Sequence, residues 1–349
     1  MTELVMDYLS KVQDNPIWDA LYEFMPYRRP QDGLYARGSL DKYVVALLTV
    51  IILLARIVFK NIVSNPIGRH YNVQKRQFKS YTWQSWLAIC HTVSMCWGLY
   101  LFYTEPLEYW KDLTLVWKGY PGPQMYLSFN LKLYYLTELA YWWHHLIVLQ
   151  TITPRRYDYS LMMGHHTVTI ALITLSYHMN FQMLGHVIMF LFDVADVFLA
   201  LSKALKYCGA HTIVDILTVM FTVSWLLTRH VGMGFVIRSV MMDAPVLMPN
   251  KVWDPEIGNY YSWNVYYFFL ALFLALELMC AYWMYLILKI AWNMLRGQHA
   301  DDDRSDIDED EEVEEEVKEP VKKHEKTPAA KHTSNGKADN ATNGLRKRS

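Results

Sequence analysis

Several common sources of stability and chemistry are missing from this sequence. Its four cysteines form no C-x-x-C pair and no cluster with histidine, which excludes a disulfide framework and a zinc site of ordinary spacing. It has no G-x-S-x-G motif, no Walker loop and no dinucleotide-binding glycine fingerprint, so three widespread enzyme classes are excluded. The N-terminal stretch "MTELVMDYLSKVQDNP" lacks the basic and then apolar pattern of a cleaved signal peptide, and we expect none.

Charge is scarce over much of the chain, whereas apolar and aromatic residues are abundant. Of the 349 residues, 53% are hydrophobic and 15% aromatic, with 13 Trp and 25 Tyr. Trp and Tyr are enriched where proteins meet both lipid and water. The net charge of −1 conceals a division, because residues 301–349 hold 15 acidic residues, 10 basic residues and no aromatic residue. The composition favours a membrane-embedded body with a charged tail, and we expect no nucleic-acid partner.

The body contains seven apolar stretches, each long enough to cross about 30 Å of hydrocarbon as a helix. We therefore predict an all-α polytopic membrane protein with about seven transmembrane helices. The third stretch and the last two are longer than a crossing requires, which indicates tilt or extension beyond the bilayer. The predicted helices cover residues 43–60, 83–103, 126–149, 161–178, 181–201, 211–238 and 263–292.

The distribution of Lys and Arg predicts which loops face the cytosol. The loop after the first predicted helix is rich in basic residues, and the third and fifth loops each carry a basic pair. The alternate loops are poorer, and the turn near residue 180 has none. The odd-numbered loops are therefore predicted to be cytosolic, with the N-terminus lumenal and the tail cytosolic. The basic residues Arg28, Arg29 and Arg37 in the N-terminal segment run against this orientation.

The tail carries a run of like charge with nothing apolar to bury, which predicts disorder. Ser305 is followed by acidic residues, a context that resembles acidophilic kinase sites and predicts phosphorylation. The terminal "RKRS" resembles a dibasic retrieval signal, so we expect the protein in the endoplasmic-reticulum membrane.

Two neighbouring helices of the prediction carry four ionisable side chains, His165 and His166 in the fourth and Asp193 and Asp196 in the fifth. Because the turn between these helices is very short, they must be antiparallel neighbours, and His166 lies at the depth of Asp193. At about 1.5 Å per residue, this layer lies about 20 Å from the turn, in the cytosolic half of the bilayer. Ionisable groups in hydrocarbon mark functional sites, and a carboxylate at the same depth can orient an imidazole.

Other histidines have plainer explanations. A single histidine in a membrane helix more often joins two helices by a hydrogen bond than catalyses a reaction, and we interpret His91, His178 and His186 in this way. His144 and His145 fit interfacial anchors and site-lining residues equally well. No H-x-x-x-H or H-x-x-H-H spacing occurs, and adjacent histidines on a helix point about 100° apart, so we expect no metal centre.

The stretch from residue 155 to residue 207 resembles the signature region of the TLC-domain ceramide synthases, most closely the fungal members. The matching features are the paired arginines followed by Asp158, the His165-His166 doublet and the D-x-x-D of Asp193 and Asp196. The segments "KLYYLTELAYWWHHLIVLQ" and "WLLTRHVG" and the acidic tail resemble the same family. Glu138 and the His144-His145 pair depart from the family pattern, so no role is carried over to them.

The resemblance implies transfer of a fatty acyl group from coenzyme A to the amine of a long-chain sphingoid base. His165 would act as nucleophile or general base, Asp193 would orient the active ring, and His166 and Asp196 would position substrate or move the second proton. Either histidine fits either part. Arg155 and Arg156 would bind the phosphates of coenzyme A or serve as ordinary positive-inside residues, and Arg229 would assist from the sixth helix at the substrate site. His144 and His145, to which the resemblance gives no role, are kept as candidates to line the substrate site.

The same resemblance divides the chain and suggests partners. The expected parts are a lumenal segment 1–42, the first helix 43–60, a basic loop 61–82, a catalytic TLC domain 83–296 and a tail 297–349. We expect lipid substrates, acyl-CoA as co-substrate, no tightly bound cofactor, and a homo-oligomer, a hetero-oligomer or a small regulatory subunit. The alternatives are a TLC-type protein that binds, senses or moves lipids without chemistry, and another membrane acyltransferase.

Overall fold

The structure is a computed structural model that describes residues 27–28, 33–151, 159–248 and 250–296. The chain divides into two units, residues 1–309 and 310–349, and all described residues belong to the first. Arg155, Arg156 and Ser305 lie outside the described residues, as do most of the N-terminal segment and the tail.

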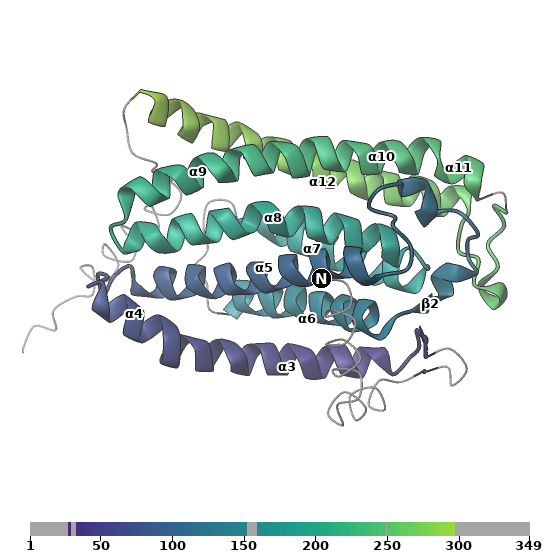
Figure 1. The fold of residues 1–349 in the computed structure, drawn as a ribbon, viewed down its shortest axis with the longest axis horizontal. Coiled ribbons are helices and arrows are strands. Elements are labelled where there is room, and N and C mark those ends of the chain that lie inside the picture. The colour runs from purple at the N-terminus through teal and green to yellow at the C-terminus, as the bar shows by residue number, and fades with distance from the viewer. Residues whose placement is uncertain (1–26, 29–32, 152–158, 249, 297–349) are drawn as a thin grey trace, which may run out of the picture. The chain divides into compact units, whose positions relative to one another are not determined.

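The predicted all-α fold is confirmed, and a helix occupies each of the seven predicted ranges (Figure 1). Five helical stretches are long and apolar enough to cross a membrane, which makes the chain a multi-pass membrane protein. The two that fall outside this set, α6 and α7, carry the histidines of the predicted site, whereas Asp193 and Asp196 stand on α8. The long helices are α3 (Asp41–Phe59), α5 (Phe78–Thr104), α6 (Phe129–Thr151), α7 (Tyr159–His178), α8 (Gln182–Tyr207), α9 (His211–Trp225) and α12 (Trp263–Leu295).

The first helix is longer than predicted. After α3 the chain continues through a π-helical segment, η1 (Lys60–Ser64), into α4 (Asn65–His70), so the predicted basic loop 61–82 is largely helical. Pro66 did not end the helix, and it stands at the start of α4 directly after the π-helical η1. The sixth helix is longer too, and runs from α9 through the π-helical η4 (Leu226–Gly232) into α10 (Met233–Met242) and α11 (Ala244–Leu247).

The third helix begins later than predicted. Tyr126–Leu127 form a short strand, β2, paired with β1 (Tyr35–Ala36), and α6 starts at Phe129. The Ser128 hydroxyl accepts a hydrogen bond of 3.1 Å from the Leu131 N–H, which caps the first turn of α6.

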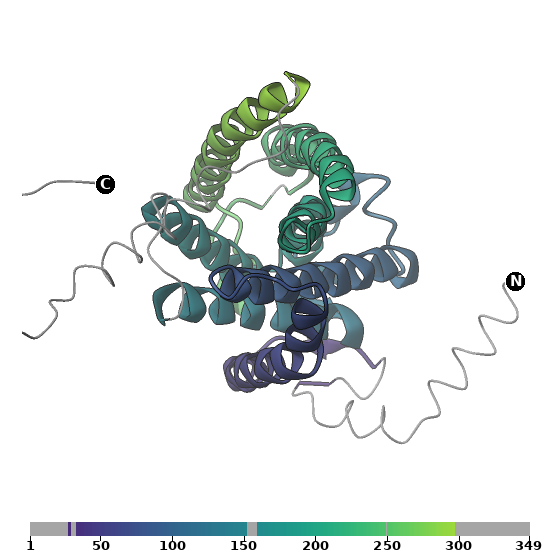
Figure 2. The ribbon, with the colours of Figure 1, turned by 90° about the vertical axis from the view of Figure 1, so that its left-hand side faces the viewer.

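Helix α8 occupies the interior, packed against α5 and α9, whereas α3 lies outside, against α6 (Figure 2). Of the most apolar 18-residue window, 56% is buried in α8 and 11% in α3. Helices α7, α8, α10 and α12 surround an internal cavity, described below. The fold therefore places the polar residues of α8 against α5 rather than against lipid.

Loops close one end of this helical bundle. They include the short helices η2 (Leu113–Val116), η3 (Pro123–Met125) and η5 (Pro255–Ile257) and the turn between α7 and α8. Asn180 in that turn has a φ of 62° and donates a hydrogen bond of 2.9 Å to the Gly258 carbonyl. Tyr120 stacks on Phe181 at 5.2 Å between ring centroids and donates to the Met179 carbonyl. Because these contacts join distant loops, this end of the bundle is sealed by the protein itself.

Candidate active site

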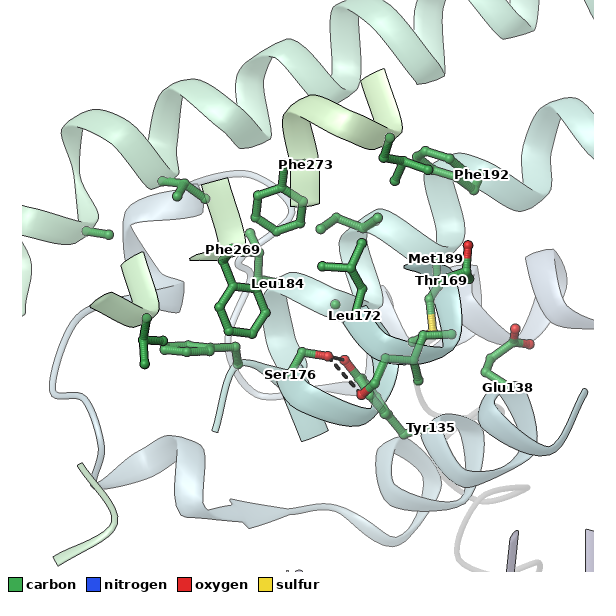
Figure 3. A pocket seen from close by; sticks show the side chains of 18 of the residues that line it. Tyr135, Glu138, Thr169, Leu172, Ser176, Leu184, Met189, Phe192, Phe269 and Phe273 are labelled. Atoms are coloured by element: carbon green, nitrogen blue, oxygen red, sulfur yellow. Dashed lines mark hydrogen bonds between the residues drawn. The ribbon is translucent and has the colours of Figure 1, made fainter. Parts of the chain in front are cut away.

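An apolar cavity, partly open to solvent, lies among α6, α7, α8, α10 and α12, and it encloses about 920 Å³ when the open space is included. Figure 3 shows Phe269, Phe273 and Leu184 on its walls. The lining residues Leu184 and Asp193 are nine positions apart on α8, so the cavity follows that helix for about 14 Å. Such a long and mostly apolar space suits a hydrocarbon chain.

Two carboxyl groups, Glu138 of α6 and Asp193 of α8, stand in the lining of this cavity. Both side chains are buried, each with 4% exposure. Asp193 Oδ1 lies 2.8 Å from His91 Nδ1, and the other nitrogen of His91 lies 3.2 Å from the Tyr141 hydroxyl. The Ser94 hydroxyl lies 2.5 Å from one oxygen of each carboxyl. A buried polar cluster from α5, α6 and α8 therefore forms the head of the cavity.

Asp196 faces a different partner, one turn further along α8. Its Oδ2 pairs at 2.7 Å with Nη2 of Arg229, which also donates to the Phe192 carbonyl. The guanidinium lies between the rings of Phe192 and Trp225, at 4.4 and 4.2 Å from their centroids. Because Arg229 is buried and stands in the π-helical η4, this ion pair ties the sixth helix to α8.

The two histidines of α7 are held differently. His166 Nδ1 lies 2.7 Å from the Met162 carbonyl, so it must donate there, and in the neutral ring Nε2 then accepts from His145 Nδ1 at 3.4 Å. His165 Nδ1 is buried and has no hydrogen-bond partner among the described residues. Its ring stands edge-on between Trp142 and Trp283, at 5.5 and 5.2 Å between centroids. Of the pair, His165 keeps a ring nitrogen free for chemistry.

The predicted pairing of these histidines with the aspartates is wrong. Among the described residues, no hydrogen bond joins His165 or His166 to Asp193 or Asp196. Helices α7 and α8 are consecutive, but α8 turns its Asp193 face towards α5 and its Asp196 face towards η4. A short turn fixes which helices follow one another and their depth, but not which faces meet.

The layer is nevertheless continuous, because α6 bridges its two halves. His145 lies 6.4 Å from His91 and 5.5 Å from His166 between ring centroids. Trp142, which touches both α7 histidines, lines the cavity together with Glu138 and Asp193. His144 and His145 are therefore interior residues, with 0% and 8% exposure, rather than interfacial anchors.

Sequence reasoning missed four members of this site, His91, Ser94, Glu138 and Tyr141. The signal for Glu138 was present, since a carboxylate within an apolar helix must find a partner or a function. His91 and Ser94 stand three residues apart and so share a helix face, which was the available hint on α5. The structural interpretation of His186 agrees with the fold, where it bonds the Tyr109 hydroxyl at 2.7 Å and the Gly98 carbonyl at 3.0 Å.

Comparisons with known proteins agree with this picture. The TLC domain matches residues 80–289. A sphingosine N-acyltransferase-like protein of Alternaria alternata is 31% identical, over 83% of this chain and 72% of its own. Sphingosine N-acyltransferase lag1 of Schizosaccharomyces pombe is 32% identical over 83% and 73%, and ceramide synthase LAG1 of Saccharomyces cerevisiae is 30% identical over 88% and 74%. The chain therefore belongs to the TLC-domain family of sphingosine N-acyltransferases.

Proposed function

We propose that the chain is a ceramide synthase, which transfers a fatty acyl group from acyl-CoA to the amino group of a sphingoid base such as sphinganine or phytosphingosine. One observation carries this proposal besides the family: an apolar cavity of about 920 Å³ ends at buried carboxyl groups beside buried imidazoles. A long apolar tail fits the cavity, and the polar head brings the reacting atoms to groups that can move protons.

His165 is the proposed nucleophile or general base, because its Nδ1 is free whereas both nitrogens of His166 are engaged. As nucleophile, the imidazole nitrogen bonds to the thioester carbon, the C–S bond breaks, and coenzyme A leaves as thiolate. The amine nitrogen then bonds to the acyl carbon and the C–N bond to the imidazole breaks, which returns His165. His166 fixes the position of α7 next to His165 through its hydrogen bond to His145 of α6.

The remaining site residues support substrate. Asp193 and Asp196 take separate parts: Asp193 with His91 at the head of the cavity, and Asp196 as the anchor of Arg229. Arg229, His144 and His145 line the approach to the layer, and Arg155 and Arg156 meet the phosphates of coenzyme A. Acyl-CoA is a co-substrate that leaves after each turnover, and the proposed reaction needs no tightly bound cofactor.

The proposed setting is the endoplasmic-reticulum membrane, with the N-terminus lumenal and the tail cytosolic. The distribution of Lys and Arg supports this orientation, which places the histidine layer near the side where coenzyme A is found. The closed end of the cavity, which includes Met248, Tyr261 and Phe269, then sets acyl-chain length from the lumenal side. Ser305 is a phosphorylation site of the tail, and the enzyme works as an oligomer or with a small regulatory subunit.

The test is a direct assay of the purified protein. Sphinganine is supplied with acyl-CoAs of several lengths, and N-acyl product and free thiol are measured together. We expect the two to rise in equal amounts, and to be lost in His165→Ala at unchanged folding. Lipid binding without consumption of acyl-CoA would instead assign the chain to a non-enzymatic TLC-type protein, and an acylated product other than a ceramide would assign it to another membrane acyltransferase.

A further inference from the structure

The Ser94 hydroxyl bridges two acids in a way that fixes their protonation. Its Oγ lies 2.5 Å from Glu138 Oε1 and 2.5 Å from Asp193 Oδ2. A hydroxyl has one proton to donate, so Ser94 donates to one carboxyl and must accept from the other. The Glu138–Ser94–Asp193 cluster is thus arranged to share one proton between its two carboxyls.

The two carboxyls of this cluster share a single partner that can carry a positive charge. That partner is His91, which pairs with Asp193, and neither carboxyl pairs with Lys or Arg among the described residues. Glu138 uses one oxygen on Ser94, and no described residue hydrogen-bonds to its second oxygen. Figure 3 shows the Glu138 carboxyl among the side chains that line the cavity. Glu138 is therefore the carboxyl that remains open to whatever occupies the cavity.

The Tyr134 hydroxyl is a further buried donor beside the cluster. Tyr134 has 0% exposure, and its hydroxyl makes no hydrogen bond of ordinary geometry among the described residues. Ser94 is near enough to accept a hydrogen bond from it, and Glu138 and Asp193 are near enough to interact with it electrostatically. Because a buried donor left unpaired costs about 1–3 kcal/mol, this hydroxyl can turn to Ser94 or to a ligand at the head of the cavity.

We propose that the Glu138–Ser94–Asp193 cluster binds the ammonium group of the amine acceptor and removes its first proton. The inference rests on the proposed acyl transfer and assigns its acceptor side to a second carboxyl, Glu138. An N–H bond of the ammonium breaks and leaves its electron pair on nitrogen, while an O–H bond forms on the carboxyl pair. The nitrogen becomes a neutral nucleophile, and the cluster changes from one proton and one negative charge to two protons and no charge.

The overall chemistry requires two proton acceptors. An ammonium that becomes an amide nitrogen loses two protons, the first before attack and the second as the C–N bond forms. The second proton goes to the nitrogen of His165 as its bond to the acyl carbon breaks, and then to solvent. The first proton passes from the cluster to the released thiolate of coenzyme A or to solvent before the next turnover. The acid cluster and His165 thus each take up one of the two protons. A cluster with merely structural duties would have its oxygens closed by fixed donors, as the ion pair of Lys132 and Asp41 does.

The proposal predicts an altered pH profile when Glu138 becomes Gln. Gln keeps the shape and donates to Ser94 as a protonated Glu does, but cannot take up a proton. At neutral pH we expect kcat/KM for sphinganine to fall about 100-fold, with KM for acyl-CoA unchanged. The activity maximum moves to higher pH, because solvent must then deprotonate the amine. The ionisable groups that surround the cluster, and stay in every variant, are Cys90 and His91 on α5, Tyr134 and Tyr141 on α6, and Asp196 on α8.

Matched variants separate this role from a structural one. Glu277→Gln, which removes another membrane carboxyl held by a histidine at 2.5 Å, should keep the wild-type profile. Ser94→Ala should shift the profile in the same direction as Glu138→Gln, and Ser94→Thr, which keeps the hydroxyl, should restore it. A Glu138→Gln enzyme with wild-type KM for sphinganine and wild-type pH profile overturns the proposal. If Glu138→Gln fails to fold, equal profiles for Ser94→Ala and Ser94→Thr overturn it, whereas a wild-type protein that makes no amide defeats the acyl-transfer function itself.

Discussion

Two buried clusters of charged residues in this molecule are similar in composition. They differ in whether every charged atom has a partner within the protein. At the closed end, Lys132 Nζ pairs with Asp41 Oδ1 at 2.9 Å and donates to the Ala36 carbonyl. The other oxygen of Asp41 accepts from the Tyr177 hydroxyl at 2.7 Å and the Gly38 N–H at 2.8 Å. Every charge there has a fixed partner within the protein, so the cluster fastens α3 to α6 and α7.

The Glu138–Ser94–Asp193 cluster is as deeply buried but leaves Glu138 without a cationic partner among the described residues. It has two acids for one histidine, a carboxyl oxygen with no described partner, and a cavity in front of it. Burial of charge costs several kcal/mol per ion unless something compensates it. Where the protein supplies a partner for each buried charge, the cluster stabilises the fold. Where the protein supplies none, a substrate can provide the partner, and the charge without a partner marks the binding site.

The largest expected effect concerns the proposed catalytic layer, on the side of the cavity. His165→Ala should lower acyl transfer about 10³-fold, because the free imidazole nitrogen beside the cavity is lost. Product formation in detergent, measured at matched thermal unfolding, checks this. Comparable loss in His178→Ala, which alters a histidine bonded to the Thr174 carbonyl of its own helix, would show that any histidine change disables the protein.

Lys132→Met tests the closed side. It leaves the Asp41 carboxylate buried without its cation, and should lower the free energy of unfolding by about 3–5 kcal/mol with little change in turnover per folded molecule. Lys111→Met removes a similar pair that is half exposed at the surface, and should change stability by less than about 1 kcal/mol. Denaturation in detergent measures both. Normal stability with lost turnover in Lys132→Met would place this cluster in the reaction.

Gly185→Ala tests the cavity between the two clusters. A Cβ there would stand 1.8 Å from the Tyr135 hydroxyl oxygen and 3.2 Å from Ser176 Oγ, so the tyrosine must shift. We expect a loss of about 1–3 kcal/mol in stability and a preference for shorter acyl chains, seen when acyl-CoAs compete in one assay. Gly234→Ala is the control, since its Cβ would meet nothing within 4 Å. An unchanged chain preference in Gly185→Ala would remove the acyl chain from this part of the cavity.

The smallest effect concerns Glu105, just beyond the end of α5. Burial raises the pKa of this carboxyl, although the hydrogen bond from the Ser128 hydroxyl opposes the shift. A raised pKa means that the folded protein binds the proton more tightly than the unfolded chain. Stability therefore falls as pH rises from the ordinary value through the raised one. Glu105→Gln should flatten the melting temperature across that range, and an unaltered slope would contradict the assignment.

The sequence was a good guide to the helices and a partial guide to the site. Charge-poor runs long enough for a bilayer predicted all seven helices, because the membrane imposes both length and composition. The same rule placed Pro66 in a loop, because the apolar run ends near residue 60, although the helix continues through η1 into α4. Residues such as Tyr126 and Leu127 were assigned to a helix for their apolar character, but pair as a strand with β1.

The polar layer was predicted with the wrong partners, and its depth in the bilayer stays a prediction. Depth follows from counting residues from a turn, whereas the rotation of a helix about its axis follows from packing against all its neighbours. Asp193 meets His91 because α5 lies against α8, and α5 is separated from α8 by two whole helices in the sequence. Pairings of this kind depend on tertiary packing that no local pattern contains.

The π-helical segment η4 gives the length of the chain itself a role. A π-turn holds an extra residue relative to an α-turn, and η4 precedes α10, which supplies Val240 to the cavity wall, and Ala244 beyond it. Removing or adding one residue within α10 ahead of Val240, where the helix is regular, would rotate everything downstream by about 100° and turn that wall towards lipid. The number of residues between Arg229 and Val240 is therefore as important for the shape of the cavity as the identity of those residues.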